Sequence, residues 1–197
     1  MGIAVSHPVL YSIPSPGDAE LVARAIAGDR WSREMIYRRH ANYLLGMTVR
    51  LMSNRSEAEE VVQDTFITGF EQLQTLRNPD ALRPWLSQIA VSLVRRRMRR
   101  SRLLRFLGLD RGADDATLES LAASGIDPEG SAELALLDQV LRAMRTELRI
   151  AWMLRRVDGL ELTEVASVSG CSLATAKRRI VEAEAIVQKH LGEGKEP

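Results

Sequence analysis

The chain has 197 residues, 45% hydrophobic and only 5% aromatic, which suits one ordinary domain or two small ones with aliphatic helix packing. Cys171 is the only cysteine, so no internal disulfide can form and a cytoplasmic location is favoured. The three histidines lie far apart in the sequence and do not have the spacing of metal ligands. No apolar run is long enough to span a membrane, and the net charge of +1 comes from 27 basic and 26 acidic residues that are segregated along the chain.

Helical periodicity dominates the first half of the chain, and no segment alternates with the period of two that indicates a strand. Ser56 and Glu59 have the spacing of a capping box, in which each side chain satisfies a free amide at the start of a helix. Pro84 is placed where the first turn of a helix tolerates proline. The expected helices therefore begin near Asp18, Trp31, Ser56 and Pro84.

The second half contains a break followed by a motif. Over residues 108–130 the periodicity gives way to glycine, serine and acids, which predicts an acidic linker. Helical patterning returns after Ser131. Further on, a short helix around Val165, a tight turn at Gly170 and a final helix capped by Ser172 are expected. This order predicts a helix-turn-helix.

The segment from Ser92 to Arg105 carries seven arginines and no acid. It follows an apolar stripe that starts at Trp85, so one helix is expected to bury its first half and present its second. A membrane-surface helix would instead interleave its charges with a bulky apolar face along its whole length. A nucleic-acid backbone is therefore the favoured partner, and a solvated charge run is the alternative.

Three stretches occur in a fixed order, EAEEVVQDTF (57–66), PWLSQIAVSLVRRRMRR (84–100) and VDGLELTEVASVSGCSLATAKRRI (157–180). Together they resemble the conserved regions of bacterial sigma-70 factors of the extracytoplasmic-function (ECF) subfamily. The resemblance implies an all-α fold with two small helical domains, 18–107 and 131–191, joined by a flexible linker over 108–130. It implies transcription initiation with core RNA polymerase, promoter DNA and an inhibitory anti-sigma factor as partners, and no catalytic residue, cofactor, metal or membrane insertion.

By this resemblance, one face of the third helix docks on the core polymerase. The acids and one amide of this helix alternate with Val61, Val62 and Phe66, so the polar side chains point outward. There they offer hydrogen-bond acceptors to a basic partner. The alternative is a well-capped surface helix with acids near its positive dipole end. The docking residues are Glu57, Glu59, Glu60, Gln63 and Asp64.

The loop over 74–82 and the helix after it match the part of the family that captures and melts the minus-ten element. Opening a duplex requires a place for a flipped base and a basic surface for the separated strand. Trp85 matches a family tryptophan, although its spacing with Ile89 is that of a core residue. Ser92 stands where the family usually has asparagine. The implied DNA-binding residues are Arg77, Asn78, Trp85, Ser92, Arg95, Arg96, Arg99 and Arg100.

The final helix matches the family's reader of the minus-thirty-five element. Its implied DNA-binding residues are Ser172, Thr175, Lys177, Arg178, Arg179 and Glu182. Glu182 lies four residues after Arg178, so the spacing predicts an ion pair that could orient Arg178 toward a guanine. Alternatively, Glu182 accepts a hydrogen bond from a cytosine amino group, or it is a solvated residue past the edge of the DNA.

Two other classes of protein stay open. One is a helix-turn-helix DNA-binding regulator that does not itself act as an initiation factor. The other is a structural adaptor or decoy that binds either polymerase or an inhibitory protein without initiating transcription. Specific transcripts formed after addition to core polymerase would distinguish an initiation factor from both.

Overall fold

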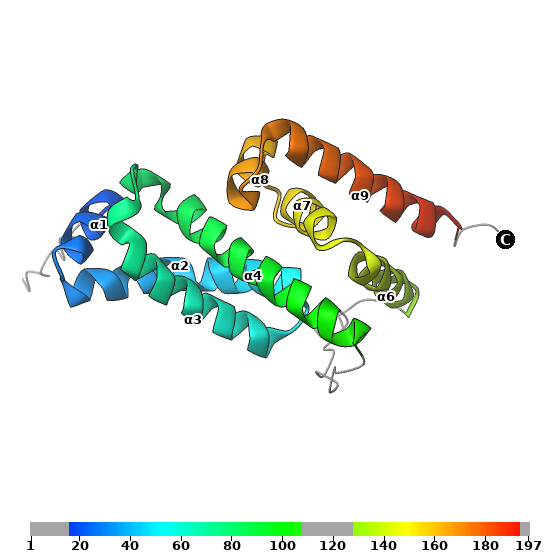
Figure 1. The fold of residues 1–197 in the computed structure, drawn as a ribbon, viewed down its shortest axis with the longest axis horizontal. Helices are drawn as coiled ribbons and strands as arrows, with labels where there is room; N and C mark the ends of the chain where they lie inside the picture. Colours follow the sequence, from blue (N-terminus) through cyan, green and yellow to red (C-terminus); the bar gives the residue numbers. More distant parts are fainter. Residues whose placement is uncertain (1–15, 108–127, 194–197) are drawn as a thin grey trace, which may run out of the picture.

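A computed structural model describes residues 16–107 and 128–193, and within them every regular element is helical. Figure 1 shows two groups of helices. The first unit comprises α1 (Asp18–Ile26), α2 (Arg30–Met52), α3 (Arg55–Gln72), the short 3-10 helices η1 (Leu73–Thr75) and η2 (Pro79–Ala81), and α4 (Leu82–Phe106). The second comprises α6 (Pro128–Ala143), α7 (Thr146–Arg156), α8 (Leu162–Ser169) and α9 (Leu173–Glu193). The all-α prediction is confirmed.

The linker expected over 108–130 falls mostly outside the described residues. Its last part is helical, because α6 already begins at Pro128. Proline is tolerated there, since the first turn of a helix has no use for its missing amide hydrogen.

The first unit buries apolar side chains from all four of its α-helices. Among them are Leu21, Val22, Leu44, Met47, Leu51, Val61, Phe66, Leu86, Val91 and Val94. α4 packs tightly against α3 at Gly69, where an added Cβ would lie only 2.9 Å from Cδ2 of Leu86. This glycine therefore sets the spacing between the helix with the docking acids and the helix with the arginines.

The start of α3 differs from the predicted capping box. Asn54 is the N-cap, and its side chain accepts a hydrogen bond of 3.0 Å from the amide of Glu57. Asparagine caps a helix as well as serine does, and here it comes two residues earlier than Ser56. Glu59 instead pairs with Arg55 at 3.0 Å. The capping box of Ser56 and Glu59 is therefore wrong.

The second unit contains the predicted helix-turn-helix. α8 ends at Gly170, whose φ of 61° is the left-handed conformation that glycine adopts without strain. Oγ of Ser172 accepts a hydrogen bond of 3.2 Å from the amide of Thr175, which confirms Ser172 as the N-cap of α9. Val165 and Ala176 are fully buried between the helices of the motif and α7.

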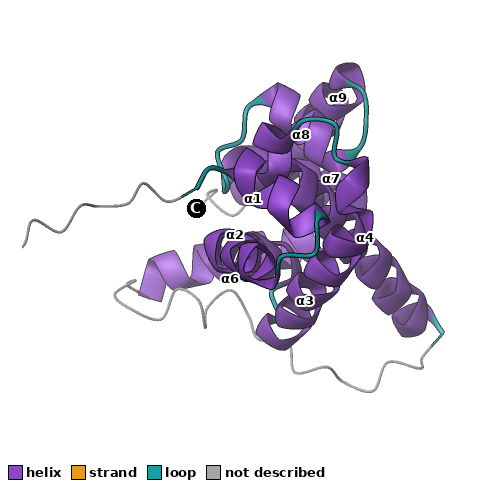
Figure 2. Cartoon of the chain, turned by 90° about the vertical axis from the view of Figure 1, so that its left-hand side faces the viewer, coloured by secondary structure: helices purple, strands orange, loops and turns teal. Residues whose placement is uncertain are grey.

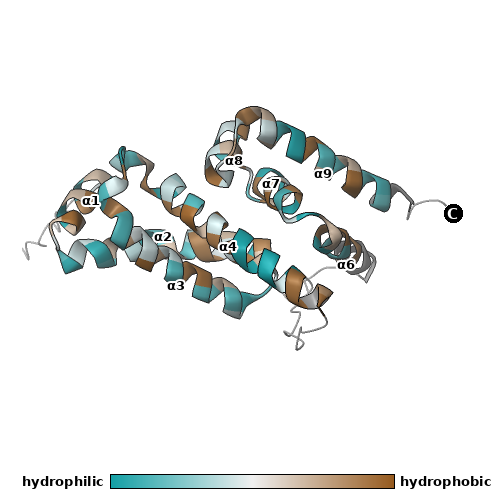
Figure 3. Ribbon diagram, viewed as in Figure 1, coloured by the Kyte–Doolittle hydropathy of each residue, from teal (hydrophilic) through white to brown (hydrophobic). Residues whose placement is uncertain are grey.

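The two units pack directly against each other. α4 lies against α8 and α7, and the end of α2 also contacts α7 (Figures 1 and 2). Figure 3 shows that the hydrophilic stretch of α4 lies between an apolar first part and an apolar tip. Buried apolar residues from both units form one cluster, so the described parts of the chain are a single packed body.

Candidate polymerase-binding and DNA-binding surfaces

The acidic face is the set of five α3 side chains that the sequence assigns to docking. Those of Glu59, Glu60 and Gln63 are exposed, while those of Glu57 and Asp64 are partly buried. Their apolar neighbours on the helix face the core. The acceptors therefore lie along the outer side of α3, as their alternation with apolar residues predicts.

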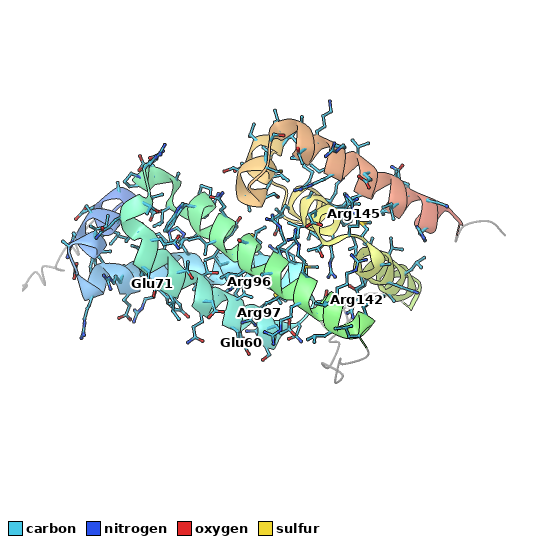
Figure 4. All side chains as sticks on the ribbon, viewed as in Figure 1. Glu60, Glu71, Arg96, Arg97, Arg142 and Arg145 are labelled. Atoms are coloured by element: carbon cyan, nitrogen blue, oxygen red, sulfur yellow. The ribbon has the colours of Figure 1, made fainter. Side chains whose placement is uncertain are left out.

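An arginine that sequence reasoning did not single out contacts the acidic face. Nη1 of Arg97 on α4 donates to Oε2 of Glu60 at 2.8 Å, and Nη2 donates to Oδ2 of Asp64 at 3.2 Å. Figure 4 shows Arg97 and Glu60 near each other where α4 runs beside α3. The guanidinium thus bridges two of the five acceptors from within the same unit.

The arginine run on α4 is divided among three directions, because successive helical residues turn by about 100°. Arg97 points to α3, and Arg96 and Arg100 are exposed to solvent. Arg95 and Arg99, one turn apart, point to the second unit instead. Nη2 of Arg95 donates to the carbonyl of Ser169 at 2.7 Å, and Arg99 forms an ion pair with Glu147.

Several positive charges lie close together at this contact. Burial lowers the pKa of Arg95, and the positive charge of Arg179 on α9 lowers it further. The hydrogen bond from Arg99 lowers the pKa of Glu147. Arginines that the sequence assigns to two different DNA elements therefore lie close together, with the Glu147 carboxylate beside them.

The loop before α4 keeps two of its predicted residues accessible. Arg77 and Asn78 are exposed, although the Asn78 side chain also caps η2 by accepting a hydrogen bond of 3.1 Å from the amide of Asp80. Ser92 is exposed on α4. Trp85 is partly buried and packs against the core, so in this structure it is a packing residue.

The predicted residues of α9 likewise divide. Lys177 and Arg178 are exposed, whereas Arg179 is partly buried near α4. The hydroxyls of Ser172 and Thr175 lie 2.9 Å apart and are engaged at the helix start. Glu182 lies 4.0 Å from Arg145, which precedes α7, so the expected pairing with Arg178 is wrong.

The described residues, 16–107 and 128–193, offer neither a metal centre nor a membrane-spanning helix. No group of three or more histidine, cysteine or acidic side chains in these ranges could hold a metal ion. None of the helices described there combines the length and apolar character that crossing a bilayer requires. His40 is buried with its Nε2 3.2 Å from Oδ2 of Asp18, and burial lowers the pKa of this imidazole although the carboxylate opposes the shift.

Comparison with known proteins gives the family of the chain. The Sigma-70 region 2 family matches residues 36–103. The chain is 28% identical over 181 residues to the RNA polymerase sigma-H factor of Pseudomonas aeruginosa, covering 88% of this chain and 93% of the relative. It is 28% identical over 177 residues to the ECF RNA polymerase sigma factor SigM of Mycobacterium tuberculosis, covering 89% and 85%.

A solved structure supports the fold. The sigma factor RpoE of Bartonella quintana, in complex with the anti-sigma factor NepR, superposes with a TM-score of 0.59 at 22% identity, covering 81% of this chain and 96% of that one. The helical fold and these relatives are those of a bacterial transcription initiation factor. The chain belongs to the sigma-70 family as an ECF RNA polymerase sigma factor.

Proposed function

We propose that the two units of this initiation factor recognise different promoter elements and that the first unit also binds the core polymerase. Residues 18–107 dock on the core polymerase and recognise the minus-ten element, and residues 131–191 recognise the minus-thirty-five element, with 108–130 as the connection. One observation carries the proposal: the family match over 36–103 covers all of α3, which bears the acidic face, and most of α4, which bears the arginine run.

The acidic face binds a basic surface of the core polymerase. Reversing charge with Glu60→Lys and Asp64→Lys should weaken binding to core polymerase in a pull-down while leaving circular dichroism unchanged, because neither side chain is part of the core. Glu34→Lys is the matched control, since Glu34 is an exposed acid on α2 that pairs with Arg38. Unchanged retention of both docking variants would contradict this surface.

In the first unit, the exposed side chains of Arg96 and Arg100 contact phosphates, since guanidinium groups neutralise backbone charge without reading sequence. Arg77 and Ser92 are also accessible to a separated strand. Trp85 supports this surface from the core, and its packing favours that role over base stacking.

In the second unit, the start of α9 enters the major groove. Its exposed Lys177 and Arg178 are the side chains available for base and phosphate contacts. Ser172 and Thr175 organise the helix start, whose free amides favour a phosphate. Glu182 is not a reader in this proposal, because its carboxylate lies toward Arg145.

The proposed function also indicates where the protein acts and which further partner it binds. The factor works in the cytoplasm, where polymerase and promoters are, and it contributes binding rather than catalysis. The complex of RpoE with NepR supports an anti-sigma factor as a further partner of this chain.

Run-off transcription tests the proposal. Adding the chain to purified core polymerase should produce transcripts with specific start sites, whereas core polymerase alone should not. A regulator that only binds DNA would shift promoter fragments without producing new transcripts. Absence of specific transcripts across a promoter library would refute the proposed function.

A further inference from the structure

Within the second unit, one carboxylate of α9 is held by two donors of α7. Nε1 of Trp152 donates to Oε2 of Glu184 at 2.8 Å, and Nε of Arg156 donates to the same oxygen at 3.1 Å. Trp152 is buried, and the Glu184 side chain is 26% exposed. The two donors are four residues apart and share one face of α7, so they converge on a single point of the neighbouring helix.

The core-facing side of α9 carries small or apolar side chains. Ala176 and Ala183 are fully buried, and Val187 is almost so. Apolar attraction is not directional and an alanine methyl interdigitates little, so these contacts hold α9 near its neighbours without fixing the rotation of the helix about its axis. A hydrogen bond requires a defined distance and angle. The two hydrogen bonds on Glu184 therefore supply the rotational constraint.

The rotation of α9 decides where the exposed cations near its start point. Lys177 comes seven residues before Glu184, which is about two turns at roughly 3.6 residues per turn, so both lie on the same flank of the helix. Arg178 follows and is also exposed. A rotation of about 10° moves a side chain at about 5–6 Å from the helix axis by about 1 Å. That shift exceeds the spread of about 0.5 Å that hydrogen-bond distances tolerate.

Contacts to bases and contacts to phosphates respond differently to such a shift. A hydrogen bond to a base edge weakens steeply when its distance or angle changes, whereas the attraction between a cation and a phosphate falls only inversely with distance. Phosphate contacts carry no direct sequence information. A small rotation of α9 therefore reduces the discrimination between DNA sequences more than it reduces the overall affinity.

We propose that Glu184 is a positioning residue for recognition of the minus-thirty-five element. Its hydrogen bonds to Trp152 and Arg156 fix the rotation of α9, and this rotation places the exposed cations near the helix start against their bases. The inference rests on the proposed function, in which the start of α9 reads this element. Glu184 itself does not touch DNA, because its carboxylate is directed toward α7 and engaged there.

The test measures binding of the holoenzyme to promoters with single substitutions in the minus-thirty-five element. The readout is the affinity for the preferred sequence, selected from a library, divided by that for each substituted one; a mismatch typically gives a ratio of about five to 150. Glu184→Ala should lower this ratio about threefold or more, while the salt dependence stays unchanged because the phosphate contacts persist. Glu184→Gln keeps an oxygen acceptor for both donors and should restore most of the ratio. Trp152→Phe removes one donor and should give an intermediate ratio.

A destabilised variant separates positioning from stability. Val187→Ala trims a buried side chain of the same helix and leaves the hydrogen bonds of Glu184 in place, so it should lower the thermal midpoint without changing the ratio. A Glu184→Ala protein that loses stability but keeps its discrimination would overturn the inference, as would an equal loss of affinity on every sequence. Absence of discrimination by the unaltered chain would instead overturn the proposed reading by α9, and the inference with it.

Discussion

The two exposed arginines of α4 give the sharpest test of the DNA surface. Arg96 and Arg100 are both exposed, and within the described residues neither has a carboxylate partner. The double variant Arg96→Gln/Arg100→Gln should therefore lose two phosphate contacts without disturbing the packing of α4. Holoenzyme should bind all promoters more weakly, and by about the same factor.

The expected magnitude follows from counterion release. Each lost phosphate contact reduces the slope of log affinity against log salt by about 0.9, so the double variant should lose about 1.8. A rise from 50 to 200 mM salt is fourfold, and it weakens binding by about 3.5-fold for each contact, or about twelvefold for two. Fluorescence anisotropy of a labelled promoter over this range measures the slope directly.

An exposed arginine outside α4 provides the control for the double variant. Arg38→Gln removes an exposed arginine of α2 that pairs with Glu34, and it should leave the slope unchanged. An unaltered slope in the double variant would mean that the run is merely solvated. A loss confined to particular minus-ten sequences would mean base readout instead.

Three other predictions concern single residues. Gly69→Ala should lower the free energy of unfolding by about 1 kcal/mol, because overpacking against Leu86 at about 1–3 kcal/mol outweighs a gain in helix propensity of about 1 kcal/mol. Burial lowers the pKa of His40, so its contribution to stability should be complete above the unfolded pKa of about 6.5 and decline as pH falls below it; urea denaturation at several pH values measures this. Glu182→Arg should leave base preferences unchanged in a minus-thirty-five library, because its carboxylate lies toward Arg145.

Each of these predictions has its own check. Leu86→Ala should relieve the clash, so the double variant with Gly69→Ala should cost less than the sum of the two singles. His190→Gln should keep the pH dependence that His40→Gln removes, since His190 is exposed. A changed base preference in Glu182→Arg would return Glu182 to the DNA-reading residues.

The helices and the helix-turn-helix could be predicted because their signals are local. Ser172 is the N-cap of α9 as expected, and Gly170 takes the left-handed conformation that the turn requires. The capping box failed for an equally local reason, since Asn54 competes with Ser56 for the same role and precedes it. Local rules identify the candidates for a helix start better than they choose between them.

The division of the arginine run could not be predicted, because it depends on partners far away in the sequence. Arg95 and Ser169 are 74 residues apart, and Arg50 and Asp158 are 108 residues apart. Composition indicates that the run is basic and periodicity indicates that it is helical. Neither indicates which of its faces a second unit covers, since that is decided by tertiary packing.

The bridge that Arg97 makes to Glu60 and Asp64 has a consequence for the entropy of binding. Acidic side chains normally lose rotamer freedom when a partner orders them, at a free-energy cost of about 0.5–1.5 kcal/mol for each flexible side chain. Here the guanidinium already orders both carboxylates before any partner arrives. An incoming cation therefore meets acceptors in fixed positions, and much of the ordering cost has been met during folding. The same guanidinium competes for those oxygens, so the gain in preorganisation is set against a weaker net attraction.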